Sequence, residues 1–263
     1  MSTLSHQTSS LLLACLFSIN VWCEEINYLV VEDISEPFQI TENNESKGGI
    51  VSDIIDEIFK GSQYSITRHV LPLKRLYKLV ESGEVTNWIA YDAKVWNALS
   101  QWGNFVDEPL FPVNHTYLTC QQDAPVQISS SKDIETHNVA IIKNFDYPEL
   151  TQLQQAGKLS LTSVDGYQQG INLAGLNRID GFIEMELRLR FNIQQEQLNK
   201  PCFQFIDMSQ VIPEYSIYLT IDKNNNVLNS FAKQRIKKLK EAGAIDSILD
   251  SYTQTKRLSS VIN

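Results

Sequence analysis

Apolar runs typical of strands alternate with helical patterns along most of the chain. In the first half, strands are predicted at residues 26–31, 64–70 and 85–91, and helices at 52–59 and 72–83. In the first of these helices, apolar residues recur at helical spacing, and Gly61 follows where a C-terminal cap is expected. This alternation predicts parallel sheets flanked by helices, an α/β architecture.

The same pattern restarts after a polar run at residues 121–133. Further strands are predicted at 115–120, 139–142, 159–162, 179–183, 204–206 and 216–221. Further helices are predicted at 148–155, 167–176, 227–242 and 245–252. The restart indicates two α/β units rather than one.

A strongly apolar run, LLLACLFSINVWC at residues 11–23, lies close to the N-terminus. Its 13 residues are too few to span a bilayer, which needs roughly 20. The run follows a Ser/Thr-rich start without Lys or Arg and ends abruptly at Glu24-Glu25, the layout of a secretory signal peptide. We predict that residues 1–23 are this signal, which leaves 263 − 23 = 240 residues in a periplasmic mature chain. A buried N-terminal helix is the alternative. No lipid anchor is expected at Cys15, because the apolar run continues past it.

The charge balance narrows the classes of partner. With 22 Lys+Arg against 31 Asp+Glu, the formal charge is −9, which argues against nucleic-acid binding because that needs a basic surface. The one basic run lies on the polar face of the helix predicted at 227–242 and comprises Lys233, Arg235, Lys237, Lys238 and Lys240. A solvated face is expected there, and a docking surface for an acidic partner is the alternative.

Two cysteines remain once the predicted signal is removed, Cys120 and Cys202. In an oxidising compartment they are a candidate disulfide. Such a bridge would close a loop of about 80 residues, worth roughly 4–5 kcal/mol in the chain-entropy model. Two unpaired buried thiols are the alternative, and the sequence leaves both open.

Signatures of metal or catalytic chemistry are missing from the sequence. There is no Gly-rich phosphate loop, no G-x-S-x-G turn and no H-E-x-x-H motif. The histidines His6, His69, His115 and His137 lie far apart, each without a second ligand at metal-binding spacing. We therefore expect no metal and no cofactor.

Six short segments in order carry a family resemblance. They are EDISEPF at 32–38 with GGIVSDI at 48–54, PLKR at 72–75 with ESGE at 81–84, NFVDEP at 104–109, residues 139–148, NRIDGF at 177–182, and 215–221 through EAGAI at 241–245 to Tyr252. Together they resemble the bacterial extracellular solute-binding proteins of family 3, in a divergent branch that carries P-x-x-R.

The resemblance implies the type II periplasmic binding protein fold, in which two α/β lobes close on a ligand by hinge motion. The first lobe would be residues 24–117 plus 215–263, and the second 118–214. It implies a monomeric, non-catalytic protein that captures a small polar solute, amino-acid-like or another amine or carboxylate. The partner would be the membrane permease of an ABC-type importer, or a sensor. An enzyme on the same fold, dehydratase-like with Glu184 or Glu186 as the acid, and an interaction module without a small ligand are the alternatives.

The resemblance also nominates ligand-binding residues. Glu32 would face a ligand amine, Phe38 lies in the loop after the first strand, and Arg75 would grip a carboxylate unless it is an exposed helix arginine. The other expected contacts are Tyr91 and Asp92 at the end of a strand, Asn144, Phe145 and Tyr147 in an anion-facing turn, and Glu184 and Glu186. These two glutamates flank Met185, which stands where the family has an amine-binding Asp.

The sequence departs from the family where amino-acid receptors carry an arginine for the α-carboxylate. The corresponding stretch, residues 94–102, reads KVWNALSQW and has no Arg. An unusual ligand, cationic or aromatic, or a degenerate cleft is therefore expected in place of a plain L-amino-acid site.

Overall fold

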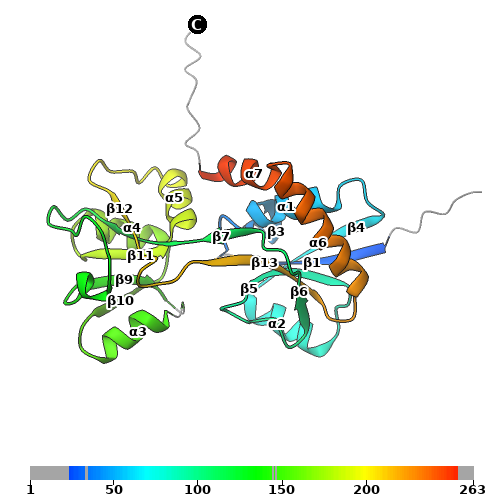
Figure 1. The fold of residues 1–263 in the computed structure, drawn as a ribbon, viewed down its shortest axis with the longest axis horizontal. Helices are drawn as coiled ribbons and strands as arrows, with labels where there is room; N and C mark the ends of the chain where they lie inside the picture. Colours follow the sequence, from blue (N-terminus) through cyan, green and yellow to red (C-terminus); the bar gives the residue numbers. More distant parts are fainter. Residues whose placement is uncertain (1–23, 33–34, 144, 146, 254–263) are drawn as a thin grey trace, which may run out of the picture.

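The computed structural model describes residues 24–32, 35–143, 145 and 147–253. The predicted signal peptide lies outside them. Two lobes stand side by side, each built on its own sheet (Figure 1). Among the described residues, no helix is both long enough and apolar enough to cross a membrane.

The first lobe contains a mixed sheet in the order β4-β1-β5-β13-β6, with β7 paired to β13. Three strands run parallel: β4 (Tyr64–Leu71), β1 (Glu24–Val31) and β5 (Trp88–Ala93). The long strand β13 (Tyr215–Asp222) lies antiparallel to β5, β6 (Gly103–Phe105) and β7 (Phe111–Val113).

Both faces of this sheet are covered, because β1 alternates between them. Ile26, Tyr28 and Val30 pack with helices α1 (Ile50–Phe59), α6 (Asn226–Glu241) and α7 (Ala244–Thr253). Leu29 faces the other way and packs with α2 (Leu73–Ser82). The near-continuous apolar run of this strand reflects burial on both sides.

The second lobe repeats the plan with the strand order β10-β9-β11-β8-β12. The parallel strands are β10 (Ser160–Val164), β9 (Asn138–Ile142) and β11 (Gly181–Met185), and β8 (His115–Thr119) pairs antiparallel with both β11 and β12 (Gln204–Asp207). Helix α3 (Pro148–Gln155) covers one face, and α4 (Tyr167–Gly175) and α5 (Glu186–Gln195) cover the other.

The chain crosses between the lobes twice. The first crossing is at Asn114, between β7 of the first sheet and β8 of the second. The second is the segment 208–214 that leads from β12 to β13. The first-lobe boundary expected at residue 117 therefore lies about three residues too late. The reason is that β7 and β8 are almost continuous in sequence and change sheets without a polar loop to mark the switch.

Several short elements were not predicted. The polar stretch after the first strand forms a hairpin of β2 (Ile40–Glu42) and β3 (Glu45–Gly48), and Ser131–Ile134 forms a single 3-10 turn. The strands β6 and β7 were also missed. The most important omission is α5, because it carries a residue of the site described below.

Two of the motif segments meet at the start of α1. Gly49 precedes the helix at φ 111°, and a Cβ there would lie 2.7 Å from the Phe38 carbonyl oxygen, so only glycine fits. The Tyr252 hydroxyl accepts from the Gly49 N–H at 2.9 Å and donates to Asp53 Oδ2 at 2.7 Å. The closing helix α7 is thereby fixed to the helix that follows the first loop.

The candidate cysteine pair is joined in the structure. The sulfurs of Cys120 and Cys202 are 2.07 Å apart. Cys120 directly follows β8 and Cys202 precedes β12, so the bridge links the ends of two antiparallel strands at the edge of the second sheet.

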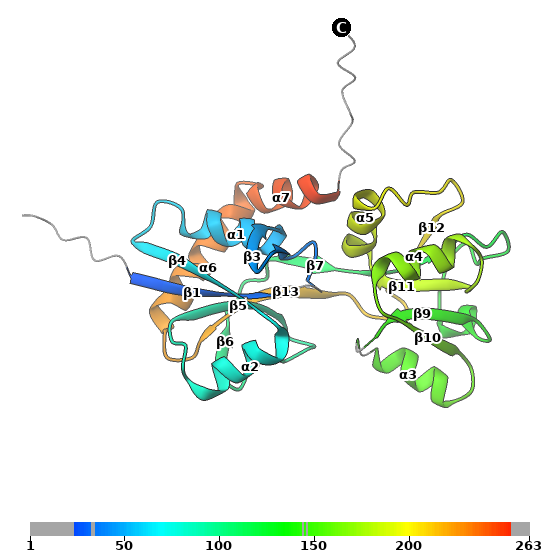
Figure 2. The same ribbon diagram turned by 180° about the vertical axis from the view of Figure 1, so that it is seen from behind.

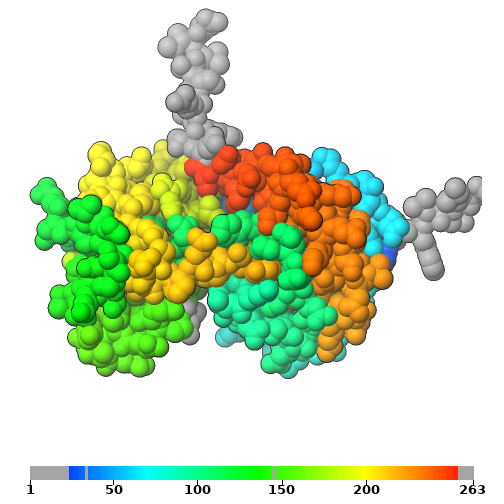
Figure 3. Space-filling view, viewed as in Figure 1, coloured from blue at the N-terminus to red at the C-terminus, as the bar shows by residue number. Residues whose placement is uncertain are grey.

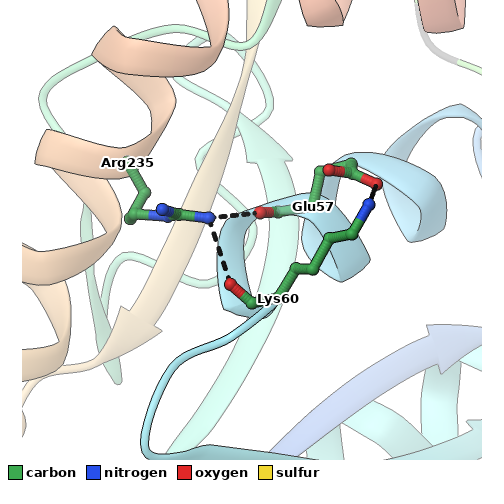
Figure 4. Close-up of polar contacts among 3 residues, drawn as sticks. All are labelled: Glu57, Lys60 and Arg235. Atoms are coloured by element: carbon green, nitrogen blue, oxygen red, sulfur yellow. Dashed lines mark hydrogen bonds and ion pairs between the residues drawn. The ribbon is translucent and has the colours of Figure 1, made fainter.

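The basic run of α6 is only partly a solvated face. Arg235 is half-buried, and its guanidinium donates to the carbonyl oxygens of Ile58 and Glu57, both at 2.8 Å, and of Lys60 at 3.3 Å (Figure 4). These carbonyls end α1 and have no further partner within the helix. A cation at this end of a helix is also favoured by its dipole.

We predict that Arg235→Ala lowers the free energy of unfolding by about 2 kcal/mol, because three carbonyls lose a charged donor. For a chain of this size that corresponds to a loss of roughly 4–8 °C in melting temperature. Lys238→Ala, an exposed position on the same helix, is the matched control and should melt within about 1 °C of the wild type. Equal melting temperatures for the two variants would contradict a capping role for Arg235.

Candidate functional site

A cavity of about 580 Å³ lies between the two lobes. It is lined at the carboxyl ends of β1 and β5 in the first lobe, and by residues that follow β9 and β11 in the second. This is where open α/β sheets place their ligands. Figure 3 shows the surface hollowed between the lobes, and Figure 2 shows α2 and α3 on either side of that gap, away from α7.

The wall from the first lobe is apolar and aromatic. It is formed by Val31, Leu73, Leu76, Tyr77, Ala90, Tyr91, Trp96 and Leu99, together with smaller contributions from their neighbours. Three of these come from α2, whose apolar face turns toward the sheet. Trp96 stands at the rim with 39% of its surface exposed.

Aromatic rings continue from this wall into the second lobe. Tyr91 meets Trp96 at 6.2 Å between ring centroids, and Trp96 meets Tyr215 at 5.8 Å. Tyr215 then contacts His115 at 5.7 Å, and His115 contacts Tyr147 edge-on at 5.3 Å. Since Tyr215 begins β13 and His115 begins β8, the two crossing segments supply the middle of this aromatic wall.

The only buried cation that lines the cavity among the described residues is Arg188, in the first turns of α5. Its guanidinium lies over the rings of Phe38, at 5.1 Å, and Phe145, at 5.2 Å. Glu184 lies on β11, just before α5, with Oε1 3.7 Å from Arg188 Nη1. That separation gives an ion pair but is too long for a good hydrogen bond.

Buried polar atoms without a hydrogen-bond partner gather around this arginine. Across the part of the chain that the structure describes there are seven such atoms, and five belong to four residues of this region: His115 Nδ1 and Nε2, Tyr147 Oη, Glu184 Oε2 and Arg188 Nε. Leaving a buried polar group unpaired costs stability, so native proteins contain few of them. Their concentration at one cavity indicates groups kept for a ligand.

The electrostatic state of these groups follows from burial. Desolvation, with a smaller contribution from Arg188, lowers the pKa of His115 to about 4, so the imidazole is neutral at neutral pH. Burial also raises the pKa of Tyr147, whose hydroxyl stays protonated. Burial raises the pKa of Glu184, although Arg188 acts in the opposite direction. Beside Arg188 the cavity is therefore lined by two neutral groups, the His115 imidazole and the Tyr147 hydroxyl, which can donate and accept hydrogen bonds.

Of the residues nominated from the sequence, four line the cavity: Tyr91, Asp92, Phe145 and Tyr147. Asp92, however, is occupied. Its Oδ1 accepts from the Ala93 N–H at 2.7 Å and its Oδ2 from the Leu99 N–H at 3.0 Å. It shapes the turn that carries Trp96. Asn144 lies outside the described residues.

The other nominated residues do not line the cavity. Arg75 is exposed on α2, on the side of the helix away from Leu73, Leu76 and Tyr77, and does not line the cavity. Glu32 also lies outside the lining. Phe38 is fully buried, and the guanidinium of Arg188 lies over its ring.

The two nominated glutamates are committed to structure. Glu184 is fully buried beneath Arg188, and Oε1 also accepts from the Met185 N–H at 2.8 Å. Glu186 binds Arg190 at 2.6 Å through Oε1 and accepts from Asn114 Nδ2 at 2.7 Å through Oε2. Glu186 thus fixes α5 to the first crossing. Neither glutamate lines the cavity.

Arg188, His115, Trp96 and Tyr215 were missed as site residues. Glu184 ends up beside Arg188 because strand β11 leads directly into α5, and that turn was not recognised from the sequence. Among the described residues no cluster of three or more His, Cys, Asp or Glu side chains could hold a metal ion.

No family model and no curated protein matches the sequence. Solved structures do match. The second Venus-flytrap domain (VFT2) of BvgS from Bordetella pertussis, as a double mutant, superposes with a TM-score of 0.65 at 15% identity over 88% of this chain and 93% of that one. The second substrate-binding domain of a putative amino acid ABC transporter from Streptococcus pneumoniae gives 0.64 at 18% identity over 88% and 100%. The ancestral amino acid-binding protein AncCDT-1, a precursor of cyclohexadienyl dehydratase, gives 0.61 at 13% identity over 88% and 95%.

The protein has the two-lobed type II periplasmic binding protein fold. The fold expected from the resemblance is therefore confirmed. The same fold occurs among these structures in a domain of BvgS, in a substrate-binding domain of a putative amino acid ABC transporter and in the precursor of a dehydratase, so the activity has to be argued from the site.

We predict that Tyr147→Phe raises the free energy of unfolding of the unliganded protein by about 1 kcal/mol, because it removes a buried hydroxyl without a partner. Tyr28→Phe is the matched control. The Tyr28 hydroxyl contacts Ser52 at 3.0 Å and accepts from Gln39 at 2.8 Å, so its loss should cost about 1–2 kcal/mol. Thermal and urea melts measure both. Destabilisation by Tyr147→Phe would mean that this hydroxyl already has a partner in the free protein.

We also predict an acid-sensitive contribution from His115. An unfolded histidine has a pKa of about 6.5, so between that pH and pH 4 the unfolded chain binds a proton that the folded protein does not. The free energy of unfolding therefore falls as the pH decreases through this window. When the pH is lowered from 7 to 5, the wild type should therefore lose about 2 kcal/mol more free energy of unfolding than His115→Phe. Buried carboxyl groups contribute equally to the pH dependence of both proteins, so their contribution cancels in the difference between the two. Parallel stability profiles between pH 7 and pH 4.5 would refute the assignment.

Proposed function

We propose that the protein is a periplasmic solute-binding protein that captures a small organic molecule between its lobes, for an ABC-type importer or a sensor. The observation that carries the proposal is the interlobe cavity, with its aromatic wall and its buried polar atoms left without partners. At about 580 Å³, its volume falls within the range of pockets that enclose small molecules. Secretion rests on the predicted signal peptide.

The two crossings support a binding cycle of opening and closing. Only residues around Asn114 and the segment 208–214 connect the lobes through the backbone. Tyr215 and His115, at the ends of these crossings, lie against each other in the cavity wall. A ligand that contacts both lobes would stabilise the closed arrangement by its differential affinity for it.

The enzyme alternative lacks its expected acid. A dehydratase-like reaction would need a carboxyl group facing the substrate, and Glu184 and Glu186 both lie outside the cavity lining. Of the other acids that line the cavity, Asp92 has both oxygens bound to backbone N–H groups, and Glu149 and Glu214 are half-buried and exposed, respectively. A catalytic acid usually depends on burial to raise its pKa. Binding without turnover is therefore the better supported activity.

We predict that purified residues 24–263 are stabilised by a compound from a panel of amino acids, organic acids, amines and sugars in a thermal-shift screen. A ligand at 100 times its dissociation constant adds about 2.7 kcal/mol, a rise of roughly 5–10 °C for this size. Tyr147→Phe and His115→Phe should weaken the shift. If no class of compound raises the melting temperature, solute binding is refuted in favour of an interaction module. Turnover of a stabilising compound would instead indicate an enzyme.

A further inference from the structure

The buried polar groups without partners around the cavity all belong to one lobe. Every buried unpartnered atom around the cavity belongs to the second lobe, on β8, β11, α5 and the residue before α3. The first lobe contributes aliphatic and aromatic side chains, together with Ser35 and the occupied Asp92. A ligand that satisfies both sides has a polar head toward the second lobe and an apolar body toward the first.

The polar group of the ligand that fits the second lobe is an anion. Arg188 is 4% exposed, lines the cavity, and has Nε without a partner. Its ion pair with Glu184 spans 3.7 Å, and the unpartnered Nε–H can donate to a ligand. A carboxylate matches the planar fork of a guanidinium. The neutral His115 and Tyr147 nearby provide N–H and O–H donors for the same oxygens.

An ammonium group has no comparable place beside that head. Glu184 is fully buried and does not line the cavity, and the oxygens of Asp92 are occupied. The remaining acids that line the cavity are Glu149, which is half-buried, and Glu214, which is exposed on the second crossing. An ion pair with either is weakened by solvent. An α-ammonium would instead lie within a few ångströms of the Arg188 guanidinium, a like charge.

The body that fits is aromatic or similarly flat and apolar. Tyr91, Trp96 and Tyr215 present successive edge-to-face rings along one wall. Aromatic ligands gain from such rings beyond the area that they bury. The aliphatic residues Leu73, Leu76 and Leu99 close the remaining side of the first-lobe wall.

We propose that the ligand is an aromatic carboxylate without an α-amino group, whose carboxylate is held by Arg188 of the second lobe. This rests on the proposed function and specifies its ligand. Residues 94–102 in the first lobe contain no arginine, and Met185, which is buried beside the cavity, offers no charge to an amine.

The test uses two matched series that differ only in the head group. The first comprises 3-phenylpropionate, L-phenylalanine and 2-phenylethylamine, and the second comprises indole-3-propionate, L-tryptophan and tryptamine. Dissociation constants are measured by calorimetry on residues 24–263. We expect at least one propionate to bind tenfold or more tightly than its amino acid, and the amines to bind more weakly still.

Two variants test whether Arg188 causes this preference for carboxylates. Glu184→Gln combined with Arg188→Gln removes both charges of the buried pair, so no lone buried charge is left to unfold the protein. This double variant should weaken propionate binding at least 30-fold while keeping its thermal transition. Arg190→Gln is the control. Arg190 is exposed on the same helix, pairs with Glu186 and does not line the cavity, so binding should stay within twofold of the wild type.

The possible results distinguish the proposal of an aromatic carboxylate ligand from the broader proposal of solute binding. Tighter binding of the amino acids or the amines, an unchanged affinity in the Glu184→Gln/Arg188→Gln variant, or a ligand of another class from the wider panel overturns the aromatic carboxylate but leaves solute binding intact. Failure of these six probes together with the wider panel overturns the proposed function itself.

Discussion

The site depends on the guanidinium of Arg188, which is buried away from solvent. Burying the charge of Arg188 is costly unless other groups compensate. Glu184 supplies the opposite charge 3.7 Å away, and Phe38 and Phe145 supply aromatic faces at 5.1 and 5.2 Å. Because Phe38 belongs to the first lobe while Arg188, Glu184 and Phe145 belong to the second, this compensation requires both lobes. The position of α5 relative to the first lobe therefore determines how well the charge of Arg188 is compensated.

The surroundings of α5 hold that position at several points. Glu186 anchors its first turn to Asn114 in the first crossing, and Met185 packs with the core of the first lobe. Farther along the helix, Phe191 meets Tyr252 of α7 at 6.4 Å between ring centroids. Helices α5 and α7 lie on the side of the molecule opposite α2 and α3 (Figure 2). The lobes are thus in contact along one edge and separated along the other, as a hinged binding protein requires.

Most of the fold could be predicted from the sequence because its strands and helices are buried in ways that local patterns record. β1 is apolar on both faces, α1 and α6 carry apolar stripes, and Gly83 ends α2 with φ 71°. Helix α5 shows where this fails. Its residues LRLRFNI alternate between apolar and polar, a period of two that favours a strand. Burial on several sides, including the polar Arg188 and Asn192, removes the amphipathic stripe that would have indicated a helix.

The candidate site was predictable only in part, for the same reason. Tyr91, Phe145 and Tyr147 were found because strand ends and the loop before a helix can be located along the chain. Arg75 was nominated because it lies in a motif on a predicted helix, whereas Arg188 lies in a segment whose helix was not predicted. The rotation of α2 turns Arg75 to solvent, whereas the packing of α5 between the lobes buries Arg188.

The sequence by itself determined two α/β units, most of their longer strands and helices in order, and several of the loops that border the cleft, because these depend on periodicity and on residues near one another in the chain. The tertiary structure alone decided which charged side chain is desolvated in the cavity and which polar atoms are left without partners. Those properties arise where β8, β11, α3, α5 and β13 converge from distant parts of the chain. Burial of a charge is set by that convergence and not by its sequence neighbours.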